Sequence, residues 1–120
     1  MAAEADDTFA RQLQALRREY LADSPQRVAE LRALSGRLAR GDLGALADCR
    51  QAFHRLAGSG GSYGFPLVST TSREGEHLVE RLAATGTSLA PSDLAGIDAC
   101  IAAIARAFAE ASTAFGQIGA

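Results

Sequence analysis

The sequence predicts an all-α protein, an antiparallel up-and-down four-helix bundle with an additional N-terminal helix. Two observations lead to this prediction. Along most of the chain, apolar residues recur at alternating steps of three and four, the spacing of one face of an amphipathic helix. No stretch shows the apolar–polar alternation that is typical of a half-buried strand. Because short connections join long apolar stripes, we expect antiparallel neighbours within a single domain, residues 1–120.

Each of the five predicted helices has its own apolar stripe. The first stripe contains Phe9, Leu13, Leu16 and Tyr20. We expect this first helix to cover one end of the bundle. The third stripe passes through Phe53 and ends in a run of glycines. The predicted helices span approximately residues 7–22, 25–40, 43–63, 66–84 and 92–116.

The ends of these helices are marked by residues with known positional preferences. Ser24 is expected to cap the second helix, because a serine hydroxyl can accept a hydrogen bond from the first turn. Pro25 then fits the first helical position. Asp42 is expected to cap the third helix in the same way. Gly64 and Pro66 predict a stop and a restart between the third and fourth helices.

Composition and charge argue against several classes of function. The formal net charge is −2, so nucleic-acid binding is not expected. All 12 basic residues are arginine. Without lysine, neither a Walker A loop nor the Lys–Glu pair of protein kinases can form, which excludes an ATP-dependent kinase of either type.

The expected location is the cytoplasm, without membrane association. The acidic N-terminus lacks the features of a signal peptide, and no apolar run approaches the ~18 residues that cross a bilayer. Cys49 and Cys100 have no metal-ligand spacing, so they are expected to be reduced thiols.

The segment HRLAGSGGSYG, residues 54–64, contains four glycines within a helical pattern. A glycine inside a helix costs about 0.5–1 kcal/mol relative to alanine, so another requirement must favour small residues here. His54 follows the core residue Phe53 and should lie at the edge of the buried face or outside it. Its helical neighbours are Arg50 and a floor of small residues at positions 47, 57, 58 and 61. A functional imidazole and an ordinary surface histidine both fit this pattern.

Glu76 is predicted to lie beside His54. If the chain turns around Phe65, both residues are 11 positions from the turn and sit at the same height on antiparallel helices. A carboxylate that accepts the Nδ1–H of the imidazole would fix one tautomer and leave Nε2 as a nucleophile. The alternative is an ordinary solvated glutamate, and periodicity does not decide on which side of the helix pair it lies.

The stretch around His54 resembles the phosphoacceptor helix of histidine-containing phosphotransfer (HPt) domains. The family pattern is H-x-x-K-G-S/A with a second glycine before the next helix, and His54, Gly58, Ser59 and Gly64 match it in register. The flanking segments EYLADSPQRVAELRALSGRLARGD and FPLVSTTSREGEHL are also similar to the family, so the resemblance covers most of the chain. The main departure is Ala57, which stands where the family usually has a lysine.

This resemblance implies a phosphorelay carrier of two-component signalling, a phosphotransfer intermediate rather than a kinase. His54 would be the phosphoacceptor and would exchange phosphoryl groups with aspartates in receiver domains of response regulators and of a hybrid histidine kinase. Glu76 falls where the family often has a Gln or Glu that orients the imidazole. Gly58 would give the partner access, and Arg50 or Arg55 could supply the charge of the missing lysine.

The same resemblance implies which cofactors and partners to expect. No cofactor of its own is expected, and Mg²⁺ would come from the partner receiver domain. Single-domain carriers of this kind are usually monomers. A protein that binds receiver domains without carrying phosphate remains an alternative, as does a purely structural helical module or homodimer.

Two other readings of these residues are less well supported by the sequence. The segment 60–64 fits the G-x-S-x-G pattern of serine hydrolases, but that nucleophile elbow requires a preceding strand, and a helix is predicted here. His77 is the only other histidine, and no His, Cys or carboxylate set recurs at ligand spacing. An exposed helical histidine is therefore expected at position 77.

Overall fold

The computed structural model describes the backbone of residues 2–86 and 88–119, and the side chains of residues 7–86 and 88–116. This described part of the chain is helical and contains no strand, so the all-α prediction is confirmed. The five helices are α1 (Ala2–Ala22), α2 (Ser24–Ala39), α3 (Ala45–Ser62), α4 (Pro66–Thr85) and α5 (Pro91–Gly119).

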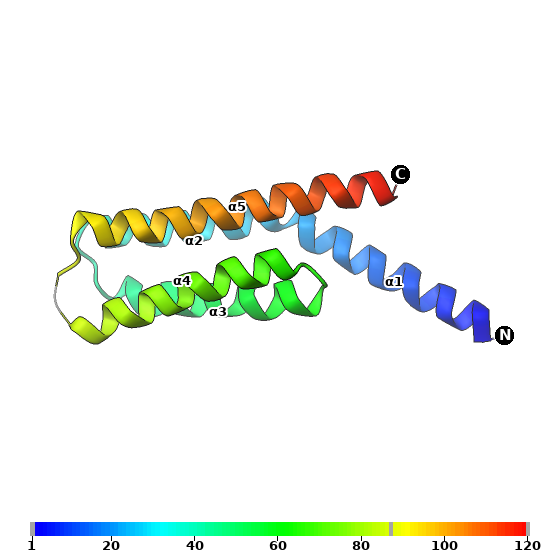
Figure 1. Ribbon diagram of the computed structural model, residues 1–120, viewed down its shortest axis with the longest axis horizontal. Coiled ribbons are helices and arrows are strands. Elements are labelled where there is room, and N and C mark those ends of the chain that lie inside the picture. Colours follow the sequence, from blue (N-terminus) through cyan, green and yellow to red (C-terminus); the bar gives the residue numbers. More distant parts are fainter. Residues whose placement is uncertain (1, 87, 120) are drawn as a thin grey trace.

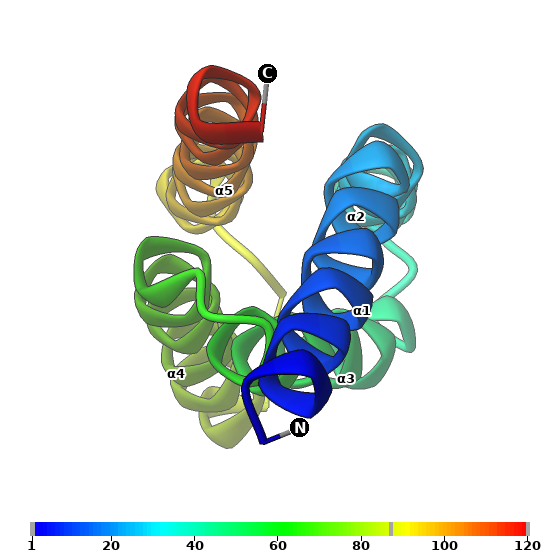
Figure 2. The same ribbon diagram turned by 90° about the vertical axis from the view of Figure 1, so that its right-hand side faces the viewer.

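Helices α2 to α5 lie side by side, and consecutive helices run in opposite directions (Figure 1). Viewed from one end, α2 and α5 form an upper layer and α3 and α4 a lower one (Figure 2). Each of these four helices contacts two of the others, α2 with α3 and α5, and α4 with α3 and α5. The α3–α4 pair therefore lies across the molecule from the α2–α5 pair.

The core between these helices consists of apolar side chains from all four. Leu31 of α2, Phe53 of α3, Val79 of α4, and Ile97 and Ile104 of α5 are fully buried. Burial of a side chain of this size contributes about 1.5–3 kcal/mol relative to exposure. The stripes seen in the sequence thus face one another, and this orientation leaves the intervening positions on the surface.

Two glycines allow α3 and α4 to pack at short range. A Cβ on Gly75 would lie 2.6 Å from Cε1 of Phe53, and a Cβ on Gly60 would lie 2.9 Å from the backbone nitrogen of Ser69. Both distances are too short for a side chain, so even alanine would force the helices apart. The Ser69 hydroxyl also donates a 2.7 Å hydrogen bond to the carbonyl of Ala57. Small residues at positions 60 and 75 are therefore required by packing.

The α3–α4 connection follows the predicted stop and restart. Gly64 has a φ of +84°, a left-handed conformation that favours glycine. The backbone N–H of Phe65 donates to the carbonyl of Gly60 at 2.7 Å and so satisfies a free carbonyl at the end of α3. Pro66 then opens α4. This tight connection fixes the height of α4 relative to α3.

The predicted caps of the second and third helices are wrong. The N-cap of α2 is Asp23, and the Ser24 hydroxyl donates to the carbonyl of Leu21 at 2.7 Å instead of accepting from the first turn. The N-cap of α3 is Gly44, with no side-chain cap. The Asp42 carboxylate instead accepts from Nε of Arg37 at 2.8 Å, because a hydrogen bond between charged groups is stronger than one to a neutral N–H.

Helix α1 differs most from its prediction. It begins before the predicted residue 7, and most of it projects beyond the α3–α4 connection, so only its last turns pack against that end (Figure 1). The side chains of Phe9, Leu13 and Leu16 are 68%, 37% and 48% exposed, and only Tyr20 of this stripe is buried. Periodicity identified the apolar face of α1 correctly, but it carries no information on whether other elements reach that face.

The C-terminal end of α1 is anchored by aromatic contacts. The ring of Tyr20 stacks on Tyr63 and Phe65 with centroid distances of 4.7 and 5.9 Å. Its hydroxyl lies 2.7 Å from Oγ of Ser59, and burial raises the pKa of this phenol. Arg17 lies over the ring of Phe65, 5.0 Å from its centroid. These contacts join the end of α1 to the last turn of α3.

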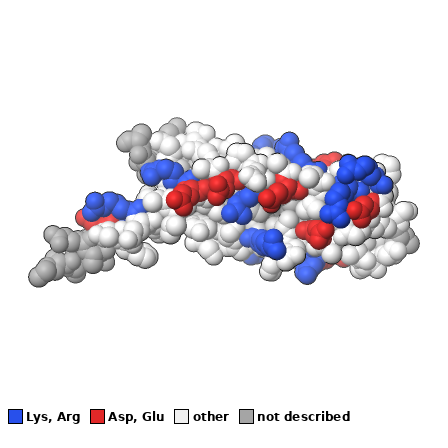
Figure 3. Space-filling model, turned by 180° about the vertical axis from the view of Figure 1, so that it is seen from behind, with Lys and Arg blue, Asp and Glu red and all other residues white. Residues whose placement is uncertain are grey.

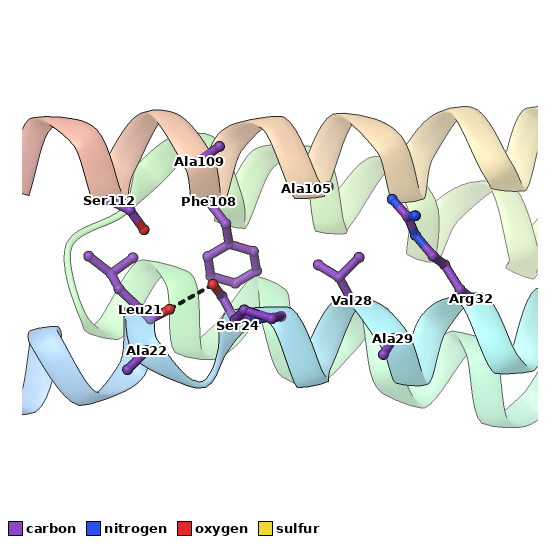
Figure 4. A pocket seen from close by; sticks show the side chains of 11 residues that line it. Leu21, Ala22, Ser24, Val28, Ala29, Arg32, Ala105, Phe108, Ala109 and Ser112 are labelled. Carbon is purple, nitrogen blue, oxygen red and sulfur yellow. Dashed lines mark hydrogen bonds between the residues drawn. The ribbon is translucent and has the colours of Figure 1, made fainter.

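A groove of about 560 Å³ lies between α2 and α5 near the junction with α1 (Figure 4). Small and apolar side chains make up most of its walls, and Arg32 is its only charged lining residue. None of the predicted site residues lines this groove, which is on the layer opposite the α3–α4 pair. On the face seen in Figure 3, acidic and basic side chains are interspersed.

None of the helices in the described ranges combines the length and the hydropathy that a membrane crossing requires.

Candidate functional site

His54 lies on the outer side of α3, next to α4. Its side chain is 70% exposed, whereas the preceding Phe53 is fully buried. This contrast follows from helix geometry, because one residue advances the helix by about 100°. Nδ1 of His54 lies 2.7 Å from Oε2 of Glu76, so the structure brings these two predicted residues together.

The contact with Glu76 determines which nitrogen of His54 faces the solvent. An ionised carboxylate can only accept hydrogen bonds, so this contact favours the imidazole tautomer that carries its proton on Nδ1. In the neutral ring, Nε2 then has a free lone pair. Because the imidazole is largely exposed and Glu76 lies on its Nδ1 side, this lone pair is open to a second molecule.

Glu76 is a buried carboxylate whose charge is compensated by its neighbours. Its side chain is only 11% exposed, and it lies on α4 directly after Gly75. Besides the hydrogen bond from His54, Oε2 lies 4.0 Å from Nη1 of Arg50. A buried charge without such partners would be costly. His54 and Arg50 are therefore the two neighbours that compensate the charge of this carboxylate.

Arg50 connects this pair to a further carboxylate. Its Nη1 lies 3.7 Å from Oε1 of Glu80, one turn beyond Glu76 on α4. His54, Glu76, Arg50 and Glu80 are hereafter called the His54 cluster. Glu80 is not among the site residues predicted from the sequence. A signal for it was present, because Arg50 lies four residues before His54 on α3 and Glu80 lies four residues after Glu76 on the antiparallel α4.

The small residues near His54 have different roles, which corrects the idea of a single access floor. Ala57 is buried against α4, and its carbonyl accepts from Ser69, so its size serves helix packing. A Cβ on Gly61 would make ordinary contacts with Ser69, the nearest at 3.5 Å. Gly58 is exposed, and a Cβ there would meet nothing within 4 Å. Packing within the described chain therefore does not explain the glycine at position 58.

The remaining candidates lie apart from the His54 cluster. Arg55 and His77 are exposed, and no ion pair or hydrogen bond of either side chain occurs within residues 7–86 and 88–116. The same residues contain no group of three or more His, Cys, Asp or Glu side chains that could hold a metal ion.

The two cysteines are poor nucleophiles at neutral pH. Both are free thiols, and Cys49 is buried whereas Cys100 is partly buried. Burial raises the pKa of Cys49 to about 11 and also raises the pKa of Cys100. Since the thiolate is the reactive form, both side chains stay protonated and unreactive. The imidazole of His54, by contrast, is largely exposed on the α3–α4 face.

Comparison with known proteins gives one match. A family model for the Hpt domain matches residues 15–107, a range that contains the whole His54 cluster. Searches of curated proteins and of solved structures find no match.

Proposed function

This chain belongs to the Hpt domain family, and from that premise we propose that it is a phosphorelay carrier phosphorylated reversibly on His54. The observation that carries the proposal is the 2.7 Å contact between Nδ1 of an exposed His54 and Oε2 of Glu76. In this proposal the partners are receiver domains of response regulators and of a hybrid histidine kinase, and the exchange takes place in the cytoplasm.

The proposed architecture for this function is an antiparallel up-and-down four-helix bundle, α2 to α5, with α1 as an additional N-terminal helix. The closed ring of contacts among α2 to α5 supports it. Its role is to hold α3 and α4 rigidly side by side, so that the imidazole and its carboxylate partner meet without an ordering cost at the moment of reaction.

The transfer step requires only the Nε2 lone pair. It attacks the phosphorus of an aspartyl phosphate, a new N–P bond forms, the P–O bond breaks, and the aspartate leaves as a carboxylate. Nδ1 keeps its proton, so the ring becomes positively charged. The Glu76 carboxylate, 2.7 Å away, stabilises this charge as it develops. In the reverse direction the N–P bond breaks, and the imidazole returns to its neutral form.

The phosphoryl group also needs compensation of its negative charge. We expect the receiver domain to supply Mg²⁺ for this purpose. On this chain we assign the role to Arg50, whose guanidinium lies 4.0 Å from the carboxylate oxygen that His54 contacts. Arg55 has no comparable link to the site. Ala57 stands where the family usually has a lysine, so Arg50 takes the place of that charge.

A labelling experiment tests the phosphoacceptor. Incubation with a phosphorylated receiver domain should transfer label to this chain, and the label should be acid-labile and alkali-stable, as expected for phosphohistidine. His54→Gln should abolish the transfer, whereas His77→Gln should leave it intact. Label that persists in His54→Gln would show that the site assignment is wrong.

The alternative function is binding of receiver domains without phosphate transfer. The observation that favours it is Ala57, which leaves the family's lysine position without a charge and faces α4. This alternative predicts that His54→Gln binds a receiver domain as tightly as the wild type and that no phosphohistidine forms under any condition. The labelling experiment therefore separates the two functions.

A further inference from the structure

We propose that Arg50 and Glu80 form a charge switch, in which Glu80 holds Arg50 away from unphosphorylated His54 and yields it to the phosphoryl group after transfer. This inference rests on the proposed function, since it concerns a phosphorylated His54. It assigns a positioning role to Glu80, which acts on the reaction through Arg50.

The first step of the argument is the position of Arg50. It lies four residues before His54, so both side chains are on the same surface of α3. Its Nη1 lies 4.0 Å from Oε2 of Glu76, the atom that accepts from His54, and 3.7 Å from Oε1 of Glu80. The guanidinium is thus one contact away from the imidazole and is held between two carboxylates.

The second step concerns the strength of these contacts. The side chains of Arg50 and Glu80 are 53% and 46% exposed. Exposed ion pairs contribute little because water screens them, so the pair can be broken at low cost. Arg50 is a long, flexible side chain, and it can change partners without movement of the backbone.

The third step is the change in charge on phosphorylation. A phosphoryl group on Nε2 adds negative charge and three acceptor oxygens one helical turn from Arg50 on the same surface of α3, and arginine forms strong, bidentate contacts with such groups. Glu76 holds Arg50 less closely, at 4.0 Å against 3.7 Å for Glu80, and its Oε2 contacts Nδ1 of His54 as well. Glu80 is exposed, can be solvated after Arg50 leaves, and has no other ion-pair partner within residues 7–86 and 88–116.

The consequence is that the two side chains have opposite effects on phosphorylation. Arg50 favours the phosphorylated state, whereas Glu80 competes with the phosphoryl group for Arg50 and disfavours that state. Removal of the Glu80 charge should therefore help phosphorylation, but only while Arg50 is present. A direct repulsion between Glu80 and the phosphoryl group would not depend on Arg50, so this dependence distinguishes the switch from simple repulsion.

Phosphoramidate allows a test on the isolated protein without a receiver domain. The Nε2 lone pair of His54 attacks the phosphorus, an N–P bond forms, the P–N bond of the reagent breaks, and ammonia leaves. Free N-acetylhistidine, added to the same solution, serves as the reference because none of the variants alters it. The rate of phosphorylation at His54 divided by the rate of N-acetylhistidine, followed by ³¹P NMR and peptide mass mapping, cancels differences in reagent concentration.

The expected results follow from an exposed ion pair. Arg50→Gln should lower the rate at His54 relative to N-acetylhistidine about twofold to fivefold, and Arg50→Lys, which keeps the charge, should restore part of it. Glu80→Gln should raise the ratio by a similar factor, and Glu80→Asp should stay near the wild type. In the Arg50→Gln background, Glu80→Gln should have no further effect.

The control is Arg81→Gln, which removes one positive charge, as Arg50→Gln does, but lies towards Cys100, whose pKa it influences. It should leave the ratio unchanged. Two results would overturn the switch and leave the proposed function intact. In the first, Arg50→Gln does not alter the rate ratio. In the second, Glu80→Gln still changes the ratio when Arg50 is absent. Failure of wild-type His54 to accept phosphate from either phosphoramidate or a receiver domain would overturn the proposed function and, with it, the switch.

Discussion

Gly58 is a residue at which helix stability and access to His54 make opposite demands. It is exposed in the middle of α3, and a Cβ there would contact nothing within 4 Å. Gly58→Ala should therefore raise the free energy of unfolding by about 0.5–1 kcal/mol. Because the added methyl group stands next to His54, the same variant should slow phosphotransfer with a receiver domain. Urea denaturation and transfer kinetics measure the two effects.

Two controls separate access from chemistry in the Gly58→Ala variant. Phosphorylation by phosphoramidate, a small donor, should be unaffected, since the obstruction applies to a protein partner. Gly116 is another exposed helical glycine whose Cβ would meet nothing within 4 Å, and it lies near the end of α5. Gly116→Ala should leave transfer unchanged. A Gly58→Ala variant that is stabilised and still transfers at the wild-type rate would contradict the access role.

Glu76 should control the tautomer of His54. In Glu76→Ala the Nδ1–H loses its acceptor, so the neutral ring should shift towards the Nε2–H form, in which the attacking nitrogen is blocked. Transfer should fall, by about tenfold to hundredfold if the loss is like that of a carboxylate behind a metal-ligating histidine. Glu76→Gln keeps an acceptor without the charge and should be intermediate. Ring ¹⁵N NMR reports the tautomer, and an unchanged Nδ1–H population in Glu76→Ala would exclude this role.

At the scale of the elements, the contact between α3 and α4 depends on the absence of a side chain at Gly75. A Cβ at this position would lie 2.6 Å from the ring of Phe53, which is fully buried and cannot move aside. Gly75→Ala should therefore destabilise the protein by about 1–3 kcal/mol, the usual cost of overpacking. Gly75→Ala should thus lower the free energy of unfolding, whereas Gly58→Ala should raise it, although alanine has the higher helix propensity at both positions.

Denaturant unfolding of the two glycine variants measures this difference directly. Displacement of α4 should also lengthen the contact between His54 and Glu76, so Gly75→Ala should lower the rate of phosphotransfer as well. If Gly75→Ala were as stable as the wild type, the helices would have to be further apart than the structure has them.

At the scale of the whole molecule, stability should fall in alkaline solution because of buried acids. Burial raises the pKa of Cys49 from 9.0 to about 11. Between these values the unfolded chain releases the thiol proton and the folded chain keeps it, so the free energy of unfolding decreases as pH rises. Urea denaturation from pH 8 to pH 11 should reveal this decrease, and Cys49→Ala should reduce its slope. An identical slope in that variant would mean that other groups cause the loss.

Much of the molecule could be predicted from the sequence because its determinants are local. The spacing of apolar residues predicts the helical class, and equal counts from Phe65 place Glu76 at the height of His54, although they do not show that the two side chains meet. Both predictions use the geometry of one helix or one tight connection, in which the positions of neighbouring residues are closely fixed.

The predictions that failed depend on contacts between distant parts of the chain. The exposure of Phe9, Leu13 and Leu16 depends on where α1 points after Asp23, and periodicity does not contain that angle. Asp42 was expected to cap α3 until a competing partner, Arg37, became visible in the structure. Such competition is decided by tertiary contacts, so local propensity alone does not predict it.

The groove between α2 and α5 has a practical consequence for experiments on this protein. The groove lies on the layer opposite α3 and α4. If the protein is attached to a solid support through this groove, the imidazole therefore faces the bulk solution. Ala29 and Ala109 are exposed on its two walls (Figure 4). A single cysteine introduced at either position, in a variant lacking the native thiols, would orient every immobilised molecule with its reactive histidine outward on a biosensor chip.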